Sequence, residues 1–517
     1  MKRAIPLLLV LSILGTAMGA IPVARWDVIP HQRIKDTFEV GVVAFHENLK
    51  CVEFYVNGKK AFTANEPALN SRTHIWEYVY PLDASKYPDG KLTLTAKAIA
   101  EDGGAKVLPE LELFANHGDS LGSKNVVWID PKNGNDFSTG TKERPVSTFK
   151  AAFARVKDGG TIMLNKGMYD GKRMGGKTKR TYWTTIRPAP GLKRGDVKIS
   201  GGRIGVDKVR FFGVDLYCDI ENDYGAVIVG EGGETSCWLD SCRIYNRKGS
   251  KADTHPFGNK MVAYVTGGAT VNMGNGPRAE IVRSHQVINV SHEAFSGENT
   301  LIVNCRAVDV TPGEGGDVSK CAFYQSAPRG KDWNEDVIVY NVSGFNLRGR
   351  GIAGSRLKNS AFVNLCLVSE KSDGNFTRFQ GAMENVIFAQ MTIVNMPWIW
   401  HDEKGGESTA DFFPRDVRVY NSVFERVEGF NYVNGTRGLK FSHNIINGID
   451  PNTRTPCQVY GEESVFSPRN FKDELNRNFA LGDETRSKKF GMPFKSIPVD
   501  INGEAFGSDR ACGAYSK

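Results

Sequence analysis

The chain has 517 residues, of which 40% are hydrophobic and 24% charged, and its formal net charge is +8. Because this length exceeds a usual single core, we expect two domains or one elongated repeat body. Lysine and arginine are spread along the sequence and form no basic tract, which argues against nucleic acid as a partner. The mild positive excess suits an anionic partner such as an acidic glycan.

The first twenty residues have the pattern of a secretory signal peptide. Lys2 and Arg3 precede an apolar run from Ala4 to Gly15, and small residues follow it. The run is too short to span a bilayer, and no later run reaches about 18 apolar residues. We therefore expect residues 1–20 to be removed and the protein to be secreted or periplasmic, without a membrane span. An uncleaved anchor is the less favoured alternative.

Residues 21–118 read as short strands separated by tight turns. The segment 51–64, CVEFYVNGKKAFTA, alternates apolar and polar residues and breaks at an Asn-Gly dipeptide, which accepts the positive φ of a hairpin. A second alternating run, 76–82, leads through a Tyr-Pro-Asp-Gly turn into 91–100. Such a series of strands predicts a small β-sandwich.

The pattern EFYVNGK … YPDGKLTLTAKAIA within this segment resembles bacterial immunoglobulin-like domains that are found beside carbohydrate-active catalytic modules. The resemblance implies a spacer or a binding aid. The small polar residues of 119–125 predict a linker after it.

From residue 126 to 517, short runs of strand-forming residues recur, most with a polar residue in mid-run. These marker residues are Asp240, Ser284, Asn304, Asn341, Asn359, Gln390, Asn421 and Ser442. Strand-only units that repeat every 20 residues or so cannot bury an apolar face alone, so they imply stacked coils with loops of variable length. We interpret the markers as ladder or turn residues that bond their neighbours.

One helix is predicted near the start of this region. The segment 147–156, STFKAAFARV, places Phe149, Ala152, Phe153 and Val156 at i, i+3, i+4 and i+7, which makes one apolar stripe. Such a helix can lie across the open first coil and cover its core.

Two longer segments carry a resemblance. The entry WIDPKNGNDFSTGTKERPVSTFKAAFARVKDGGTIMLNKGMYDG resembles that of right-handed parallel β-helix proteins of the pectate-lyase-like superfamily, and IPVDINGEAFGSDRACGAY resembles their closing segment. The resemblance implies an all-β chain, with a right-handed parallel β-helix over 126–517 that follows an immunoglobulin-like β-sandwich. It leaves the activity open, because lyases, hydrolases and adhesins share this fold.

The nine cysteines contain no CxxC pair of the zinc-binding type. Secretion permits disulfides, but the spacings do not demand them. Cys242 and Cys305 occupy corresponding positions of two runs, and Cys366 lies in a similar one. We interpret these three as small apolar core residues that stack in successive coils.

We expect the functional residues where the spacing between repeats is longest, because long loops can form the sides of a groove along the solenoid. Three insertions stand out, at 246–260, 311–336 and 396–416. The first carries Asp253 and His255 among its charged residues.

The other two insertions supply most of the candidate site residues. The second carries Glu314, Asp317, Lys320 and Tyr324, and the third sets Trp398 and Trp400 beside His401. Aromatic faces beside carboxylates and a histidine suit a sugar ring. A solvated loop with structural tryptophans is an equal alternative for the third insertion.

Four further candidates lie at expected coil corners. SHEAFSG contributes His292 and Glu293, and NLRGRG contributes Arg348 and Arg350. In the β-helix proteins that this stretch resembles, a motif of the H/D-A-F type occupies the first corner. A His-Pro-Asp-Val type motif precedes the strand NVIVYNV in those proteins. Here the second motif reads Gly-Gly-Asp-Val, so the aspartate matches and the histidine is missing. Any histidine-dependent role at this corner is therefore in doubt. The arginines could also simply bond coil carbonyls.

These residues fit a polysaccharide lyase acting on an acidic, uronate-containing glycan by β-elimination. That reaction needs a neutralised carboxylate and a base that removes the C5 proton. The resemblance implies a Lys or Arg base with calcium or basic residues on the carboxylate. We assign catalytic roles to Lys320, Arg350, His292 and Asp317, and substrate binding to Trp398, Trp400, His401, Arg348 and Tyr324. Glu293 and Glu314 are the candidate ligands for Ca²⁺.

Two alternatives remain open. A glycoside hydrolase would need paired carboxylates, for which Asp317 with Glu293 or Asp402 with Glu403 are candidates. A non-catalytic glycan-binding or surface protein would use the same loops only to hold a polymer. A capped solenoid has no need to associate, so we expect a monomer.

Overall fold

The computed structural model describes most of the chain after the leader segment. The described residues are 20–118, 125–221, 224–231, 235–250, 252–258, 261–312, 321–326, 333–354, 356–370, 375–379, 383–396, 398–401, 414–427, 429–431, 438–447, 464–466, 471–474, 477–482, 491–506 and 510–516. Among them, no helix has the length and the apolar character needed to cross a lipid bilayer.

Residues 23–115 form a β-sandwich of two sheets. One sheet contains β1 (Val23–Trp26), β3 (Thr37–Phe45), β7 (Ile75–Asp83) and β6 (Ala68–Asn70). The other contains β2 (Arg33–Ile34), β10 (Leu111–Ala115), β8 (Gly90–Ala100), β4 (Leu49–Val56), β5 (Lys59–Ala64) and β9 (Ala105–Val107). A 3₁₀ turn, η1 (Ala84–Lys86), follows β7. The β4–β5 hairpin turns at Asn57 and Gly58, with φ of 51° and 77°, as the Asn-Gly dipeptide predicts.

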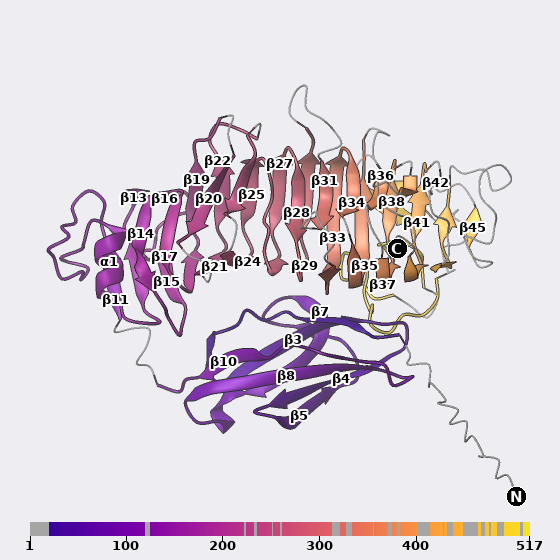
Figure 1. Cartoon of the computed structure of the whole chain (residues 1–517), viewed down its shortest axis with the longest axis horizontal. Helices are drawn as coiled ribbons and strands as arrows, with labels where there is room; N and C mark the ends of the chain where they lie inside the picture. Colours follow the sequence, from indigo (N-terminus) through magenta and orange to yellow (C-terminus); the bar gives the residue numbers. More distant parts are fainter. Residues whose placement is uncertain are drawn as a thin grey trace, which may run out of the picture.

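From Val126 onward the chain is a right-handed parallel β-helix (Figure 1). Successive strands wind about one axis, and each pairs in parallel with the strand one coil earlier. We name its three faces A, B and C. Face A comprises β11 (Val126–Ile129), β12 (Thr161–Leu164), β15 (Thr184–Pro188), β18 (Val209–Phe212), β21 (Thr235–Asp240), β24 (Met261–Thr266), β26 (Ile281–Arg283), β29 (Leu301–Val303), β32 (Asn334–Glu335), the first halves of β33 (Ile338–Leu347) and β35 (Leu357–Val368), β37 (Met383–Ala389), β40 (Arg415–Tyr420) and β43 (Leu439–Ser442).

The other two faces complete each coil. Face B comprises β13 (Gly167–Tyr169), β16 (Val197–Ser200), β19 (Asp215–Cys218), β22 (Arg243–Asn246), β25 (Ala269–Met273), β27 (Gln286–Val290), β30 (Arg306–Val310), the second halves of β33 and β35, β38 (Thr392–Val394), β41 (Val423–Glu425), β44 (Ile445–Ile446) and β45 (Val465–Phe466). Face C comprises β14 (Arg173–Thr178), β17 (Gly202–Val206), β20 (Gly225–Gly230), β23 (Thr254–Phe257), β28 (Glu293–Gly297), β31 (Ala322–Ser326), β34 (Arg350–Gly354), β36 (Asn375–Phe379), β39 (Trp398–His401) and β42 (Gly429–Asn431). A short hairpin, β46 (Phe471–Asp473) and β47 (Asn478–Leu481), lies outside the coils.

Five of the eight marker residues turn the corner from face A to face B. Ser284, Asn304, Asn341, Gln390 and Asn421 all have φ between 51° and 58°. Asparagine and other short polar residues tolerate this left-handed conformation because their side chains bond locally. The side-chain amide of Asn341 donates to Asn304 Oδ1 at 2.5 Å, one coil away. The interpretation of the markers as ladder and turn residues is confirmed.

The predicted capping helix is α1 (Phe149–Arg155). Thr148 caps its N-terminus by accepting a hydrogen bond from the Ala151 backbone N–H at 3.2 Å. Phe149, Ala152 and Phe153 are buried in the same core as the first coils. The helix therefore covers the open end of the tube, as predicted.

Cysteines belong to the interior of the structure. Cys242, Cys305 and Cys366 are buried, and burial raises the pKa of each thiol to about 12. The eight cysteines within the described residues are free thiols, and Cys457 lies outside those residues. The interpretation of the three as core residues is confirmed.

The C-terminal segment folds back along the corner between faces A and B. Asn364 Nδ2 donates to the Val499 carbonyl at 2.8 Å, and Gln390 Nε2 donates to the Gly513 carbonyl at 2.7 Å. The corner amides of two coils thus hold this segment in place. Its register on the coils places it beside the tube rather than across its end.

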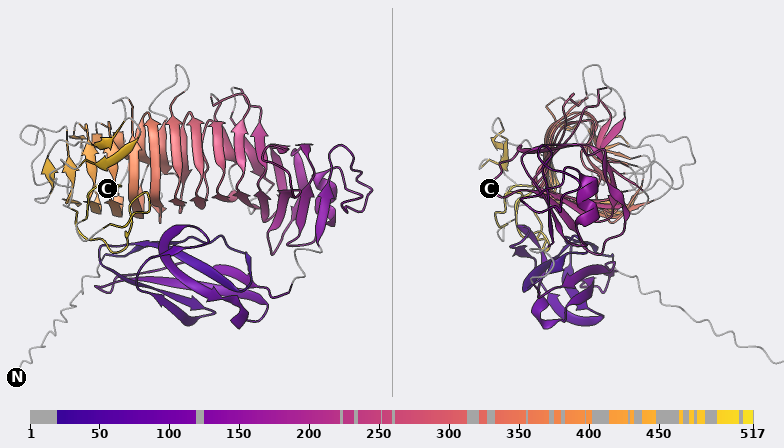
Figure 2. Two further views of the ribbon diagram at one scale, coloured as in Figure 1. Left: turned by 180° about the vertical axis from the view of Figure 1, so that it is seen from behind. Right: turned by 90° about the vertical axis from the view of Figure 1, so that its left-hand side faces the viewer.

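The sandwich packs lengthwise against face A (Figure 2). Outward side chains of face A, among them Trp238, Tyr264 and Tyr340, form one buried apolar cluster with Ile29 and Phe45 of the sandwich. The ring centroids of Phe45 and Tyr340 lie 5.2 Å apart. A spacer would leave this face exposed, so the sandwich acts as a structural partner of the β-helix.

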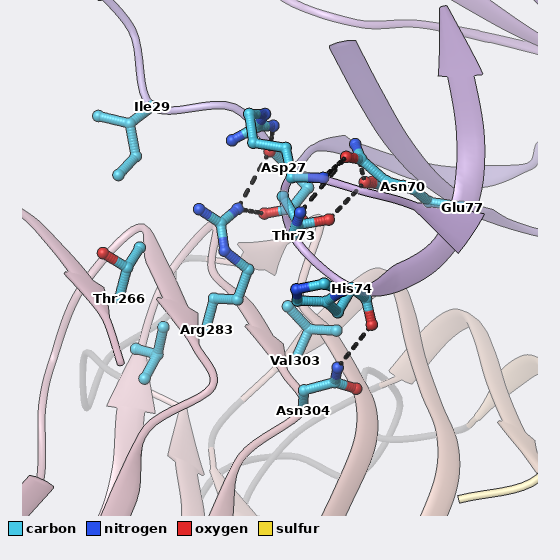
Figure 3. Close-up of polar contacts among 12 residues, drawn as sticks. Asp27, Ile29, Asn70, Thr73, His74, Glu77, Thr266, Arg283, Val303 and Asn304 are labelled. Atoms are coloured by element: carbon cyan, nitrogen blue, oxygen red, sulfur yellow. Dashed lines mark hydrogen bonds and ion pairs between the residues drawn. The ribbon is translucent and has the colours of Figure 1, made fainter. Parts of the chain in front are cut away.

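A buried polar cluster lies at the centre of this interface (Figure 3). The Arg283 guanidinium of β26 forms an ion pair with Asp27, whose carboxylate is fully buried. Beside it, Glu77 Oε1 accepts hydrogen bonds from Asn70 Nδ2 at 2.8 Å and Thr73 Oγ1 at 3.2 Å. Burial raises the pKa of Glu77 well above its ordinary value, and the negative charge of Asp27 raises it further.

Glu77 makes the stability of the protein depend on pH. Because its pKa is raised in the folded state, the stabilisation is complete below the unfolded pKa of about 4.3 and decreases as pH rises towards the folded pKa. In Glu77→Gln, the amide oxygen can still accept from Asn70 and Thr73 but cannot ionise. We expect the variant to gain Tm relative to the wild type at about pH 8, and the gain to disappear near pH 4. Thermal unfolding at both pH values measures this, and a difference that does not change with pH would contradict it.

Candidate functional site

The described candidate residues from the two corner motifs lie together at the edge between faces B and C. Glu293 is the first residue of β28 and His292 precedes it, while Arg350 is the first residue of β34. Arg348 follows β33 directly. Face C carries no sandwich, so this edge is on the free side of the tube (Figure 1).

The other candidates divide into two groups. Lys320, Asp317 and Glu314 lie outside the described residues, as do Asp402 and Glu403. Trp398, Trp400 and His401 form β39, which belongs to the same sheet as β28 and β34, but their side chains lie outside the described part. Their assignments remain predictions.

Backbone pairing aligns the corner residues in one row. Glu293 pairs with Ala322, and Ala322 pairs with Arg350. On the other side, the Asn275 N–H donates to the Thr254 carbonyl at 2.8 Å, and the Gly276 N–H donates to the Glu293 carbonyl at 2.7 Å. These bonds place Asn275 between His255 and Glu293. Because parallel strands lie about 4.8 Å apart, the row from His255 to Arg350 spans about 19 Å.

Three side chains of this row reach solvent, whereas those of Asn275 and Ala322 are buried. His255, Glu293 and Arg350 are partly exposed, whereas the two residues that follow each of them are buried. Those buried pairs are Pro256 with Phe257, Ala294 with Phe295, and Gly351 with Ile352. The strands β23, β28 and β34 thus have a partly exposed residue near their start and buried residues directly after it. We call the five aligned residues His255, Asn275, Glu293, Ala322 and Arg350 the outer row.

A hydrogen-bonded carboxylate lies at one end of the outer row. Asp253 Oδ1 is 3.1 Å from His255 Nε2 and accepts a hydrogen bond from Asn275 Nδ2 at 2.7 Å. The hydrogen bond from His255 lowers the pKa of Asp253, and the charges of His255 and His292 lower it further, against the opposing effect of burial. Asp253 therefore stays ionised beside His255, and the charge of His292 also acts on it.

His292 is held at the corner by its neighbours. Its backbone N–H donates to the Gly274 carbonyl at 2.8 Å, and its carbonyl accepts from the Ala322 N–H at 3.0 Å. Its ring nitrogen Nδ1 lies 3.3 Å from Ser291 Oγ, which itself donates to the Ser250 carbonyl. The imidazole is half-buried.

An exposed aromatic ring adjoins this cluster. Tyr224, at the start of β20, is 58% exposed, and its ring centroid lies 5.2 Å from that of His255. A tyrosine ring that is exposed beside polar groups suits the C–H face of a sugar. Tyr224 and Asn275 are not among the residues chosen from the sequence, where nothing distinguished them from ordinary loop residues.

Tyr324 requires a correction. We expected it to bind substrate, but its side chain is completely buried and its hydroxyl donates to the Gly297 carbonyl at 2.8 Å. Its ring packs 5.7 Å from that of Phe362 in the core. The apolar position inside β31 outweighs its place in a long insertion, so Tyr324 is a core residue.

The calcium prediction depends on residues that are only partly described. Glu293 belongs to the outer row, while Glu314 lies outside the described residues. Within the described ranges, no group of three or more His, Cys, Asp or Glu side chains is arranged to hold a metal ion. Calcium binding stays a prediction.

Comparison with known proteins yields only distant likenesses. No protein-family model and no curated protein matches the sequence. Among solved structures, the fibronectin(III)-like modules of Clostridium thermocellum CbhA match 19% of this chain at 12% identity, with a TM-score of 0.15. In that match the chain spans about half, 48%, of the matched chain.

Two further structures match over more of the chain. A rhamnogalacturonan lyase matches 62% of this chain and 87% of its own at 14% identity, with a TM-score of 0.38. The Yersinia enterocolitica family 28 exopolygalacturonase matches 86% of this chain and 98% of its own at 10% identity, with a TM-score of 0.34. These identities and TM-scores are too low to assign an activity, and the β-helix is established by the chain's own strand pairing.

Proposed function

We propose that the protein is a secreted carbohydrate-active enzyme that binds an acidic polysaccharide across the outer row and cleaves it by β-elimination. One observation carries this proposal. His292 and Arg350 stand on one exposed edge, about two strand spacings or 10 Å apart, which leaves room for a sugar between them. The ionised carboxylate of Asp253 interacts electrostatically with His292.

The reaction assigns a role to each of these side chains. Arg350 binds the uronate carboxylate of the substrate and neutralises its negative charge. This makes the C5 proton of the sugar more acidic. His292 then removes that proton as the general base. The C4–O bond breaks, a C4=C5 double bond forms, and the leaving oxygen takes a proton. Asp253 stabilises the imidazolium that His292 becomes.

Neighbouring sugars are held along the same row. Tyr224 and His255 form an aromatic and polar contact at one end, and β39 with its tryptophans lies on the other side of Arg350 in the same sheet. A row of this length spans several sugar units, which favours a polymer as the substrate. Lys320, Asp317 and Ca²⁺ bound by Glu293 and Glu314 remain further proposed participants.

A glycoside hydrolase is the second candidate, and one observation favours it. Asn275 Nδ2 donates to Asp253 Oδ1, and the backbone N–H of Glu293 donates to Asn275 Oδ1 at 3.4 Å, so Asn275 lies between two residues that carry carboxylates. A hydrolase needs two such groups on either side of the scissile bond. Glycan binding without cleavage is the third candidate.

Analysis of the reaction products distinguishes a lyase, a hydrolase and a glycan-binding protein. The secreted protein is incubated with acidic polysaccharides, with and without a calcium chelator, and ultraviolet absorbance of unsaturated uronates is followed together with reducing ends. We expect both signals to rise in parallel. Reducing ends without new double bonds would identify a hydrolase, and neither signal with retained affinity for the polymer would identify a binding protein.

Arg350→Gln is expected to raise KM by about tenfold or more, because a charge-assisted bond to the substrate carboxylate contributes about 1.5–3 kcal/mol. Thermal unfolding should remain nearly unchanged, since the side chain is partly exposed. The matched control is Arg203→Gln, which removes an exposed arginine of face C in β17, several coils away. Equal kinetics for the two variants, or a large loss of Tm in Arg350→Gln, would make Arg350 structural.

A further inference from the structure

A cavity of about 880 Å³ lies where the sandwich, the β-helix and the C-terminal segment meet. We infer that it is a second binding site, specific for a short acidic sugar and separate from the outer row. It is lined by Leu69, His74 and Trp76 of the sandwich, by corner and face B residues of three coils, and by Val499, Ile501 and Tyr515 of the C-terminal segment. Its volume lies in the range of sites for small organic ligands.

The charge of the cavity favours an anion. Arg306 and Arg477 both line it, both are exposed, and their guanidinium carbons lie 5.2 and 5.0 Å from the centroid of the Phe345 ring. Among the described residues, no carboxylate forms an ion pair with either arginine, and no Asp or Glu lines the cavity. Two guanidiniums fixed on one buried ring therefore offer their donors to a ligand carboxylate.

The remaining polar groups favour a sugar over a simple anion. Ser284, Asn304, Asn341 and Ser343 line the corner, and Asn304 Nδ2 donates to the His74 carbonyl of the sandwich at 3.1 Å (Figure 3). Asn341 Oδ1 is buried and accepts no hydrogen bond from any described group. The serine hydroxyls and side-chain amides that line the corner can both donate to and accept from sugar hydroxyls, which a deprotonated phosphate or carboxylate alone does not offer.

An aromatic side chain completes the site. Trp76 of β7 is partly exposed and lines the cavity opposite the coil residues. The C–H face of a sugar ring stacks on an indole while its hydroxyls bond amides and serines. The sandwich thus contributes part of the site, which gives it a role beyond covering face A.

The cavity and the outer row lie at different edges of the tube. Gln286 lines the cavity and starts β27, and His292 follows six residues later at the far edge of face B. An extended strand of this length covers about 20 Å, so one sugar cannot occupy both places. A cut chain end or a released product can bind in the cavity while the polymer lies in the row.

Titration calorimetry with trigalacturonate tests the inference. The base protein is His292→Gln, so that the ligand is not consumed, and galactose and inorganic phosphate are the comparison ligands. We expect adding Arg306→Gln and Arg477→Gln to weaken trigalacturonate binding at one site by tenfold or more. Arg243→Gln is the matched control, because Arg243 lies in the same column of face B, packs on Tyr245 and does not line the cavity.

Each outcome decides a separate point. An affinity that is unchanged in the double arginine variant overturns the inference. Phosphate that binds as tightly as trigalacturonate, and is lost in the same variant, makes the cavity a general anion site and overturns its sugar specificity. Binding that is lost in Trp76→Ala but survives Arg350→Gln supports the cavity even if no polysaccharide is cleaved, so this test and that of the proposed function fail independently.

Discussion

Replacing His292 by glutamine is expected to lower kcat on an acidic polysaccharide by a factor of about 10² to 10⁴, the usual contribution of a general base. Glutamine retains a polar side chain at this half-buried corner but cannot take a proton. The backbone bonds of His292 to Gly274 and Ala322 do not involve the side chain, so the coil should keep its register. KM should change little, because the imidazole acts on the transition state.

A second histidine provides the control for this experiment. His443 also follows a serine, and its Nδ1 lies 2.6 Å from Ser442 Oγ, but it stands at the corner between faces A and B in a late coil. His443→Gln should therefore retain full turnover. Equal losses in both variants, or a Tm of His292→Gln several degrees below the wild type, would show that His292 supports the coil and does not act on substrate.

The largest expected effect on stability comes from Asp27→Ala. Arg283 is only 8% exposed. The change therefore leaves its guanidinium buried without the carboxylate that pairs with it. Removing one partner of a buried ion pair costs about 3–5 kcal/mol, because the remaining charge is desolvated and unpaired. Urea unfolding should show this loss as an earlier transition, and the sandwich should separate from face A more easily.

Two further variants isolate the cause. Asp27→Leu combined with Arg283→Met removes both charges and should recover most of the lost stability, since apolar replacements of buried pairs are often neutral. Glu298→Ala breaks the exposed pair with Arg278 and should leave the transition unchanged. If Asp27→Ala behaves like Glu298→Ala, the polar cluster does not hold the two units together.

The β-helix could be predicted because its signal is local and repeated. Each coil needs a polar residue that tolerates a left-handed turn, and residues such as Asn304 and Asn341 therefore recur along the sequence. The capping helix follows from one apolar stripe. The docking of the sandwich could not be predicted. A strand with apolar residues on both sides has the same sequence pattern whether or not a second unit covers its outer side. Trp238 and Tyr264 are such cases.

The site was predicted only in part for a related reason. His292, Glu293 and Arg350 could be chosen because they follow strands directly. The partnership of Asp253, His255 and Asn275 depends on how many residues each coil contains, since contacts between coils join residues 18 to 22 positions apart. Tyr324 shows the opposite error, because its position in a long insertion concealed that it lies in the middle of a core strand.

The most direct test of the account is a crystal structure of His292→Gln with an acidic oligosaccharide soaked at increasing concentration. We expect sugar rings along the outer row, with one uronate carboxylate on Arg350 and its C5–H facing residue 292. An oligosaccharide found only in the cavity near Arg306, or along face B with the outer row empty, would contradict the account.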